Sequence, residues 1–406
     1  MKTVHVNLPR AFLLWGSCLL TFLGNAWDVE HDVVMQLVGE HLPHEIAAKM
    51  SFSDFGIMMA NCHYPDWIEG VEPGRFRTCE ELAADVGCED AAILREQGFR
   101  NAGWFHSERG RGMLLALLAK SFKSENFSRA AFYMASLQHV VADVSALNHT
   151  PIANYCHAGN RGKGVLRTRK VEPGAKNIFG FRSDGAVVRL VRERLKGYVP
   201  KCPADDFSTS RDAFVVDAIR QADLAAVQER TILFGPLADA QSSLANLVAM
   251  QVRVIEDMIW TAWKFRDSYS FPDEGFSDRV AVQQDSVARK IDPARQGVFT
   301  EVFDPSLDPH ESVATVVVVC EPYSRAMQGP ELSYFAKVDT LFAVREMRRR
   351  GFAVKGVSLY RLEDEGALPN PQTEDYLYLP RNGKTLSGKG EAAVATFLKG
   401  GGRMWK

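Results

Sequence analysis

Residues 136–151, SLQHVVADVSALNHTP, place two histidines and an aspartate in a segment that otherwise has the pattern of a buried helix. A helix repeats every 3.6 residues, so His139 and Asp143 project from the same side, one turn apart. Apolar residues surround the pair, and an unpaired charge at the edge of a core is costly. Pro151 disfavours helix at the residue before it, so the chain is expected to turn there and bring His149 back over the helix end. The three side chains form a candidate metal cluster.

A structural explanation of the pair stays open beside this one. A hydrogen bond between His139 and Asp143 can satisfy both groups in a packed helix, and a single H-x3-D pair more often does this than bind an ion. Other segments add residues of the types that bind zinc. Taken singly, each can be an exposed residue, a helix cap or a packed ring. They are His31, Asp66 in NCHYPDW, His106 in GWFHSERG and His157 in NYCHAGN.

Length and composition predict two folded domains. The chain has 406 residues, of which 46% are hydrophobic and 10% aromatic, and this excludes a disordered protein. The 48 Lys and Arg residues nearly balance the 50 Asp and Glu residues. No electrostatic surplus therefore favours duplex nucleic acid or an anionic membrane surface as a partner.

The first 26 residues have the pattern of a secretion signal. A basic start is followed by an apolar run that is too short for a membrane-spanning helix, and small residues precede Trp27. Cleavage after Ala26 leaves Trp27 as the N-terminus of a secreted or periplasmic protein with no stable membrane span. Export permits disulfides among the six remaining cysteines, and spacing makes Cys79 with Cys88 the easiest local loop.

The periodicity divides the exported chain into three parts. Residues 27–267 have mainly helical periodicity and predict an all-α domain. Residues 268–310 are rich in Pro, Asp and Ser and are expected to be a linker. In residues 311–406, a β-branched run, VATVVVVC, begins an alternation of strands and helices that predicts a smaller α/β domain with a parallel sheet, either minimal or incomplete.

The candidate ligands occur in the order found in one known superfamily. A Trp exposed as the mature N-terminus with a His one turn later, a Pro-Asp segment, a His before a helix and H-x3-D-x5-H together resemble the zinc-dependent phospholipase C and single-strand-specific nuclease superfamily, over about residues 27–160. The resemblance implies an all-α domain that hydrolyses phosphodiesters with two or three zinc ions.

The resemblance also implies a ligand for each ion. The amine and carbonyl of Trp27, with His31 and Asp143, would hold one zinc, and Asp143 would bridge to a second held by Asp66, His106 and His139. Asp66 would orient or deprotonate the attacking water. His149 would begin a third site.

The match to the superfamily fails at the third site. The next histidine, His157, is followed four residues later by Arg161 instead of an acidic residue. His157 is then a ligand together with another carboxylate, such as Asp205 or Asp206, or the third ion is absent.

The second domain resembles the flavodoxin-like, glutamine-amidotransferase-like domains that are appended to some exported hydrolases. Cys320 ends the first expected strand and lacks the glycine-flanked elbow of a nucleophile, so we expect a role in oligomerisation or partner binding instead of catalysis.

Two functions remain open at this stage. The leading hypothesis is an exported zinc-dependent phosphodiesterase acting on a phospholipid head group or on single-stranded nucleic acid. The alternative is a metal-stabilised binding or scaffold protein with a degenerate active site.

Overall fold

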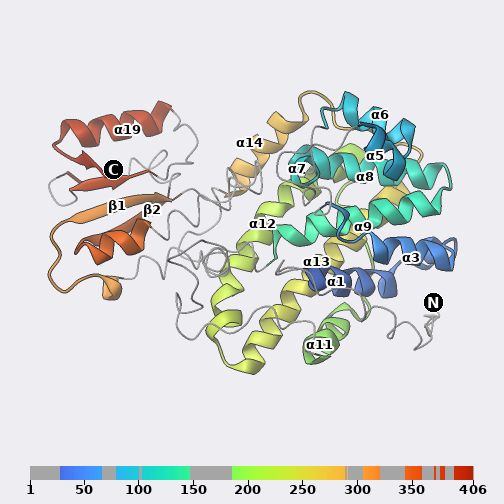
Figure 1. Ribbon diagram of the computed structural model, residues 1–406, viewed down its shortest axis with the longest axis horizontal. Coiled ribbons are helices and arrows are strands. Elements are labelled where there is room, and N and C mark those ends of the chain that lie inside the picture. Colours follow the sequence, from blue (N-terminus) through green and yellow to red (C-terminus); the bar gives the residue numbers. More distant parts are fainter. Residues whose placement is uncertain are drawn as a thin grey trace.

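Two regions of different secondary structure make up the described part of the chain (Figure 1). Helices occupy the region up to residue 288, and a small parallel sheet with flanking helices lies in residues 315–405. This confirms the predicted order of a helical region followed by a smaller α/β region. The computed structural model describes residues 28–65, 79–99, 103–146, 185–288, 290, 305–320, 343–358, 370–371, 375–379 and 388–405.

The helical region begins with short helices and ends with long ones. In chain order they are α1 (Asp28–His41), α2 (His44–Ala47), α3 (Phe52–Ala60), α5 (Cys79–Val86), α6 (Cys88–Glu96), α7 (Gly103–His106), α8 (Glu108–Lys123), α9 (Phe127–Val144), α11 (Gly185–Leu195), α12 (Phe207–Phe234), α13 (Leu237–Lys264) and α14 (Phe276–Ala288).

Helix α9 lies at the centre of this region. Every side chain from Ala130 to Ala142 is buried, so no face of this part of the helix meets solvent. Helices α1, α3, α8, α12 and α13 pack around it. Asn126 caps its first turn by accepting a hydrogen bond from the backbone N–H of Arg129. A helix covered in this way buries its polar side chains too, so these need partners inside the protein.

A close backbone approach positions His106 at the end of α7. A Cβ atom at Gly110, in the first turn of α8, would collide with the carbonyl oxygen of Trp104 and the backbone of Phe105. Ser107 separates the two helices and caps α8 by accepting a hydrogen bond from the N–H of Gly110. The sharp turn between α7 and α8 therefore depends on the absence of a side chain at Gly110.

Packed structure continues into the segment that was expected to be a linker. Helix α14 lies within residues 268–310, and its Phe276 and Val280 form a buried cluster with Val215 and Val216 of α12. The helical region thus extends to residue 288.

Among its described residues, the α/β region has four parallel strands in the order β2-β1-β3-β4. In the central pair, β1 is in register with β2 from Thr315 opposite Ala353 to Cys320 opposite Ser358. The parallel sheet predicted from the alternation of strands and helices is confirmed. Its elements are β1 (Thr315–Cys320), β2 (Ala353–Ser358), β3 (Tyr376–Tyr378), α19 (Gly388–Lys399) and β4 (Arg403–Met404), with a 3-10 turn, η5 (Pro305–Leu307), before them.

Helices cover both faces of this sheet. Val316 and Val318 of β1 pack on one face with Met347, which lies in a helical turn at residues 343–349. Val317 and Val319 face the opposite side, in the cluster that contains Phe397 of α19. Successive side chains of a strand point to opposite faces, so a strand buried on both sides is a continuous apolar run, as VVVV is here.

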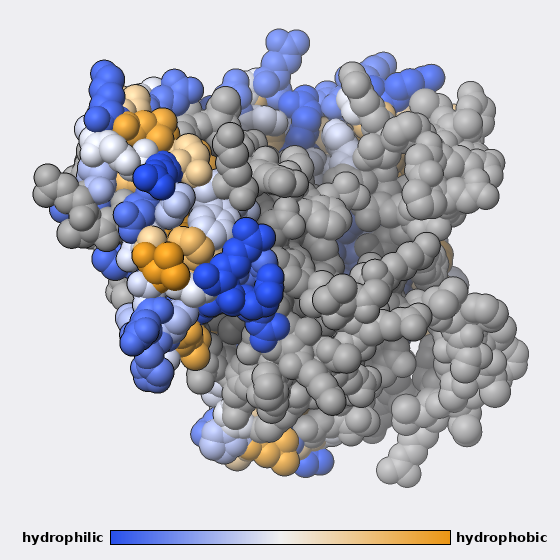
Figure 2. Space-filling model, turned by 60° about the vertical axis from the view of Figure 1, so that its left-hand side comes forward, coloured by the Kyte–Doolittle hydropathy of each residue, from blue (hydrophilic) through white to orange (hydrophobic). Residues whose placement is uncertain are grey.

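The described surface offers no large apolar area on the face shown in Figure 2. Apolar residues lie there in small groups between hydrophilic ones. Among the helices that the structure describes, none is both long enough and apolar enough to cross a membrane.

Three of the cysteines are free thiols: Cys62 is buried, Cys88 is exposed and Cys202 is half-buried. The loop between Cys79 and Cys88, the easiest pairing by spacing, is therefore not closed by a disulfide. Burial, together with the nearby Asp32 carboxylate, raises the pKa of the Cys62 thiol far above its ordinary value, so this thiol is protonated at neutral pH.

Candidate metal centre

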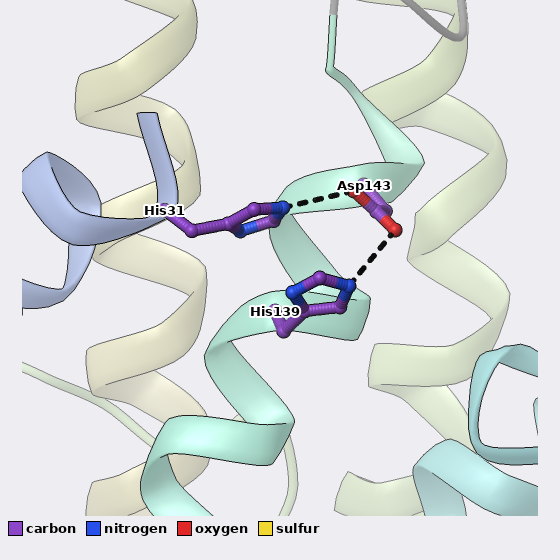
Figure 3. Close-up of side chains that lie close together, drawn as sticks. All are labelled: His31, His139 and Asp143. Atoms are coloured by element: carbon purple, nitrogen blue, oxygen red, sulfur yellow. Dashed lines mark ion pairs between the residues drawn. The ribbon is translucent and has the colours of Figure 1, made fainter. Parts of the chain in front are cut away.

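Three imidazole rings surround the carboxylate of Asp143 in the last turn of α9. The Nε2 atom of His31 lies 3.3 Å from Oδ1, while Nε2 of His106 and Nε2 of His139 lie 3.2 and 3.5 Å from Oδ2. Figure 3 shows the rings of His31, from α1, and His139, from α9, directed at this carboxylate. The fold thus brings four of the sequence-predicted ligands together from α1, α7 and α9.

These separations fit ligands of a metal better than direct hydrogen bonds. A hydrogen bond between an imidazole N–H and a carboxylate is ordinarily about 2.7–2.9 Å long. Two ligand atoms that share a tetrahedral zinc ion, each at about 2.0–2.1 Å from it, lie about 3.3–3.5 Å apart. Both oxygens of Asp143 meet imidazole nitrogens at such distances, Oδ1 on one side and Oδ2 on the other, which is the arrangement required of a carboxylate that serves two ions.

The ring of His139 is held by its other nitrogen. His139 Nδ1 lies 2.9 Å from the carbonyl oxygen of Cys62, which can only accept, so Nδ1 carries the proton and donates. Nε2, which faces Asp143, then carries no proton and can bind a metal through its lone pair. Histidines that bind metals are commonly oriented by such a hydrogen bond from the second ring nitrogen.

Gln138 performs the same task for His31. Its amide nitrogen lies 3.2 Å from Nδ1 of His31, and its Oε1 atom has no hydrogen-bond partner within the described part of the chain. A half turn of the amide exchanges these two atoms and lets Oε1 accept a hydrogen bond from Nδ1–H. His31 can therefore present a free Nε2 lone pair to a metal, with the amide supporting the required tautomer.

Burial keeps His31 in the neutral form that binds metals. Desolvation by burial and, next in size, the nearby His139 ring lower the pKa of His31 to about 4, although Asp143 partly opposes this shift. His31 and His139 are 1% and 0% exposed, and their rings stack at 4.0 Å between centroids. At this distance, a positive charge on one ring disfavours a positive charge on the other.

A neighbouring group of side chains was not anticipated. Asp32 follows His31 in α1, and its Oδ1 accepts hydrogen bonds from His63 Nε2 at 2.9 Å and from the Cys62 thiol at 3.1 Å. Their atoms lie close enough together to hold an ion as well. The two contacts have ordinary hydrogen-bond lengths, however, and they tie Cys62, whose carbonyl orients His139, to α1. The sequence contained one sign of this group, because Cys62 and His63 are adjacent residues of metal-binding type in NCHYPDW.

Four of the predicted site residues lie outside the described residues: Trp27, Asp66, His149 and His157. Of the two carboxylates considered for a third ion, Asp206 caps α12 by accepting a hydrogen bond from the N–H of Thr209, and Asp205 is exposed. The described residues therefore locate the predicted bridging carboxylate and three of its histidine partners.

Comparison with models of protein families, with curated proteins and with solved structures finds no match for this chain. The interpretation of the site consequently depends on its own geometry.

Proposed function

We propose that this protein is an exported zinc-dependent hydrolase of phosphodiester bonds. The observation that carries the proposal is the half-buried carboxylate of Asp143 with three imidazole Nε2 atoms 3.2–3.5 Å from its two oxygens. Neutral imidazole and carboxylate are the ligands of zinc in hydrolytic sites, and a mixed set without thiolate is typical of catalytic sites more than structural ones. Zinc bound there would supply an activated water and polarise a phosphoryl oxygen.

The protein's own contribution is to hold these ligands in place before substrate arrives. Cys62 and Gln138 orient the rings of His139 and His31, and the buried main part of α9 fixes the spacing between His139 and Asp143. Preorganised ligands do not have to rearrange as charge develops on the phosphate. Asp66 keeps its proposed role of orienting or deprotonating the attacking water, because the superfamily that the sequence resembles places a carboxylate there.

The first test compares zinc content and hydrolysis in the mature chain and in Asp143→Ala. We expect two or three zinc ions per wild-type chain by elemental analysis, and hydrolysis of bis-p-nitrophenyl phosphate that zinc restores after chelation. Loss of the bridging carboxylate removes at least one ion and lowers kcat/KM by roughly 10³-fold or more, as expected when a metal-assisted step is lost.

Asp217→Ala is a matched control, because Asp217 is a partly exposed carboxylate on α12 that pairs with Arg220. It should keep the zinc content and activity of the wild type. Fewer than one ion per wild-type chain would end the metal proposal. Full zinc content without hydrolysis of any phosphodiester would favour the alternative, a metal-stabilised binding protein.

A further inference from the structure

A second charged group is buried behind the candidate metal centre, on α8. Arg111 is 4% exposed, and its Nη1 atom donates a hydrogen bond of 3.0 Å to the carbonyl oxygen of His106. Its Nε and Nη2 atoms are buried and have no hydrogen-bond partner among the described residues. These two N–H groups lie on one edge of the planar guanidinium, which is the edge that grips an anion with two parallel hydrogen bonds.

Another buried arginine shows how this fold ordinarily satisfies such a group. Arg211 on α12 is 2% exposed, and its Nε and Nη2 atoms donate to Oδ1 of Asp212 at 2.9 and 2.8 Å. Its Nη1 donates to the carbonyl oxygen of Ser270. At Arg111, the nearest acidic influence is Glu108, one turn earlier, but the two side chains make no ion pair in the described structure. A buried guanidinium without a counter-ion is costly, and guanidinium does not lose its proton in proteins.

A small cavity lies beside Arg111, between α8, α9, α12 and α13. It is narrow and partly open, with a volume of about 10 Å³. Arg111 and Gln221 are the polar residues among the described residues that line it; the others are Val141, Val144, Phe214, Val215, Ala218, Val254 and Met258.

We propose that this cavity is a binding site for one small monatomic anion of the size of chloride, held by the Nε–H and Nη2–H groups of Arg111. The space is narrow, and apolar side chains form the rest of its wall, which favours a small and weakly hydrated anion over phosphate. A water molecule would accept the hydrogen bonds but would leave the buried positive charge without a counter-ion. A halide ion accepts the hydrogen bonds and is also a counter-ion for the guanidinium.

Gln221 completes the site. It is 3% exposed, and its Oε1 atom has no hydrogen-bond partner among the described residues. A half turn of the amide replaces this oxygen by the NH₂ group, which donates to the anion. The site then consists of one guanidinium edge and one amide, with an apolar wall that excludes larger and more strongly hydrated anions.

The test follows thermal unfolding of the full, zinc-loaded chain while chloride replaces gluconate at constant ionic strength. The unfolding temperature should rise by about 2–3 °C for each tenfold increase in chloride above the dissociation constant, because only the folded state has the site. Arg111→Met should lose this dependence. Arg220→Met, at a 63% exposed arginine of α12, is the control and should keep it.

Chloride also binds zinc, so a chloride dependence in the wild type alone does not identify the site. The decisive result is the difference in chloride dependence between Arg111→Met and Arg220→Met. Zinc content is measured on each variant, which separates this site from the proposed metal centre. Equal chloride dependence in Arg111→Met and wild type would overturn the proposal. If Arg111→Met does not fold, crystals of the wild type soaked in bromide decide the question: an anomalous peak beside the Nε–Nη2 edge of Arg111 supports the site, and a cavity without one contradicts it.

Discussion

Two aspartates, the buried Asp90 and the half-buried Asp143, both meet side chains of α9 but at different distances. Asp90 accepts a hydrogen bond of 2.6 Å from Lys120 Nζ at one oxygen and one of 2.5 Å from Tyr133 Oη at the other. Asp143 meets three imidazole nitrogens, all at 3.2 Å or more. The Asp90 contacts have the lengths of strong charge-assisted hydrogen bonds, and the Asp143 contacts do not.

The difference separates a structural carboxylate from a candidate ligand. Around Asp90, the protein's own donors come into direct contact and satisfy the charge. Around Asp143, the three imidazole nitrogens lie at distances that suit an ion between them and the carboxylate.

The largest expected effect concerns Trp27, the predicted second source of ligands for the ion on the His31 side. A backbone amine binds zinc only when it is free, and the α-amino group has an ordinary pKa near 8, so a dication can displace its proton. A form with one extra residue before Trp27 should lose one zinc ion and most hydrolytic activity while its circular dichroism stays unchanged. Equal zinc content and activity in the two forms would remove Trp27 from the site.

The next effect is on the stability of the protein when Asp90 is replaced. Asp90→Ala leaves the Tyr133 hydroxyl without its acceptor and Lys120 with Glu89 as its remaining partner, so the free energy of unfolding should fall by about 2–3 kcal/mol in urea titrations. Zinc content per folded chain should stay that of the wild type. A loss of zinc in this variant would show that the two carboxylates do not have separate roles.

A third buried carboxyl group, Glu256 of α13, has neither arrangement. Burial raises the pKa of Glu256 to about 9, with a further contribution from the charge of Asp257. The unfolded chain loses this proton near pH 4.5 and the folded chain keeps it until about pH 9, so stability is present below pH 4.5 and is lost as the pH rises between these values.

Glu256→Gln should therefore stabilise the protein at pH 8 by up to about 4–5 kcal/mol and leave its stability at pH 4 unchanged. Urea unfolding at the two pH values measures this, with Glu274→Gln, at an exposed position, as the control. A variant that is no more stable than the wild type at pH 8 would show that Glu256 is charged in the folded state.

The smallest effect tests the support of His31. Gln138→Leu removes the amide that orients this ring and should weaken zinc binding by about 10–100-fold, as measured by competition with a chelating dye. Gln36→Leu, on the exposed face of α1, should not change the affinity. Unchanged affinity in Gln138→Leu would mean that packing alone orients His31.

Local spacing was sufficient to predict part of this site. The H-x3-D pattern placed His139 and Asp143 on one face of a helix, and the VVVV run identified the central strand of the parallel sheet. Both inferences depend only on the period of one element. His31 and His106 reach the same carboxylate because of the way α1 and α7 pack against α9. In the sequence, only the resemblance to a superfamily suggested this contact.

The supporting contacts were beyond prediction from the sequence. The carbonyl of Cys62 orients His139 through a backbone atom, which has no signature in the side-chain pattern. Gln138 and Asp32 adjoin predicted ligands in the chain, yet their orientation follows from tertiary packing. The polar composition of residues 268–310 likewise gave no indication of α14. The burial of this helix depends on a few apolar residues, Phe276 among them, that pack on α12.

The most direct measurement of the central claim is an anomalous difference map at the zinc absorption edge, from crystals of the mature chain. We predict two peaks beside the Asp143 carboxylate, one about 2.0–2.1 Å from Nε2 of His31 and the other at that distance from Nε2 of His106 and of His139. Crystals grown with zinc that show no peak at Asp143 would contradict the account, and the three imidazoles would then be a packed polar cluster without an ion.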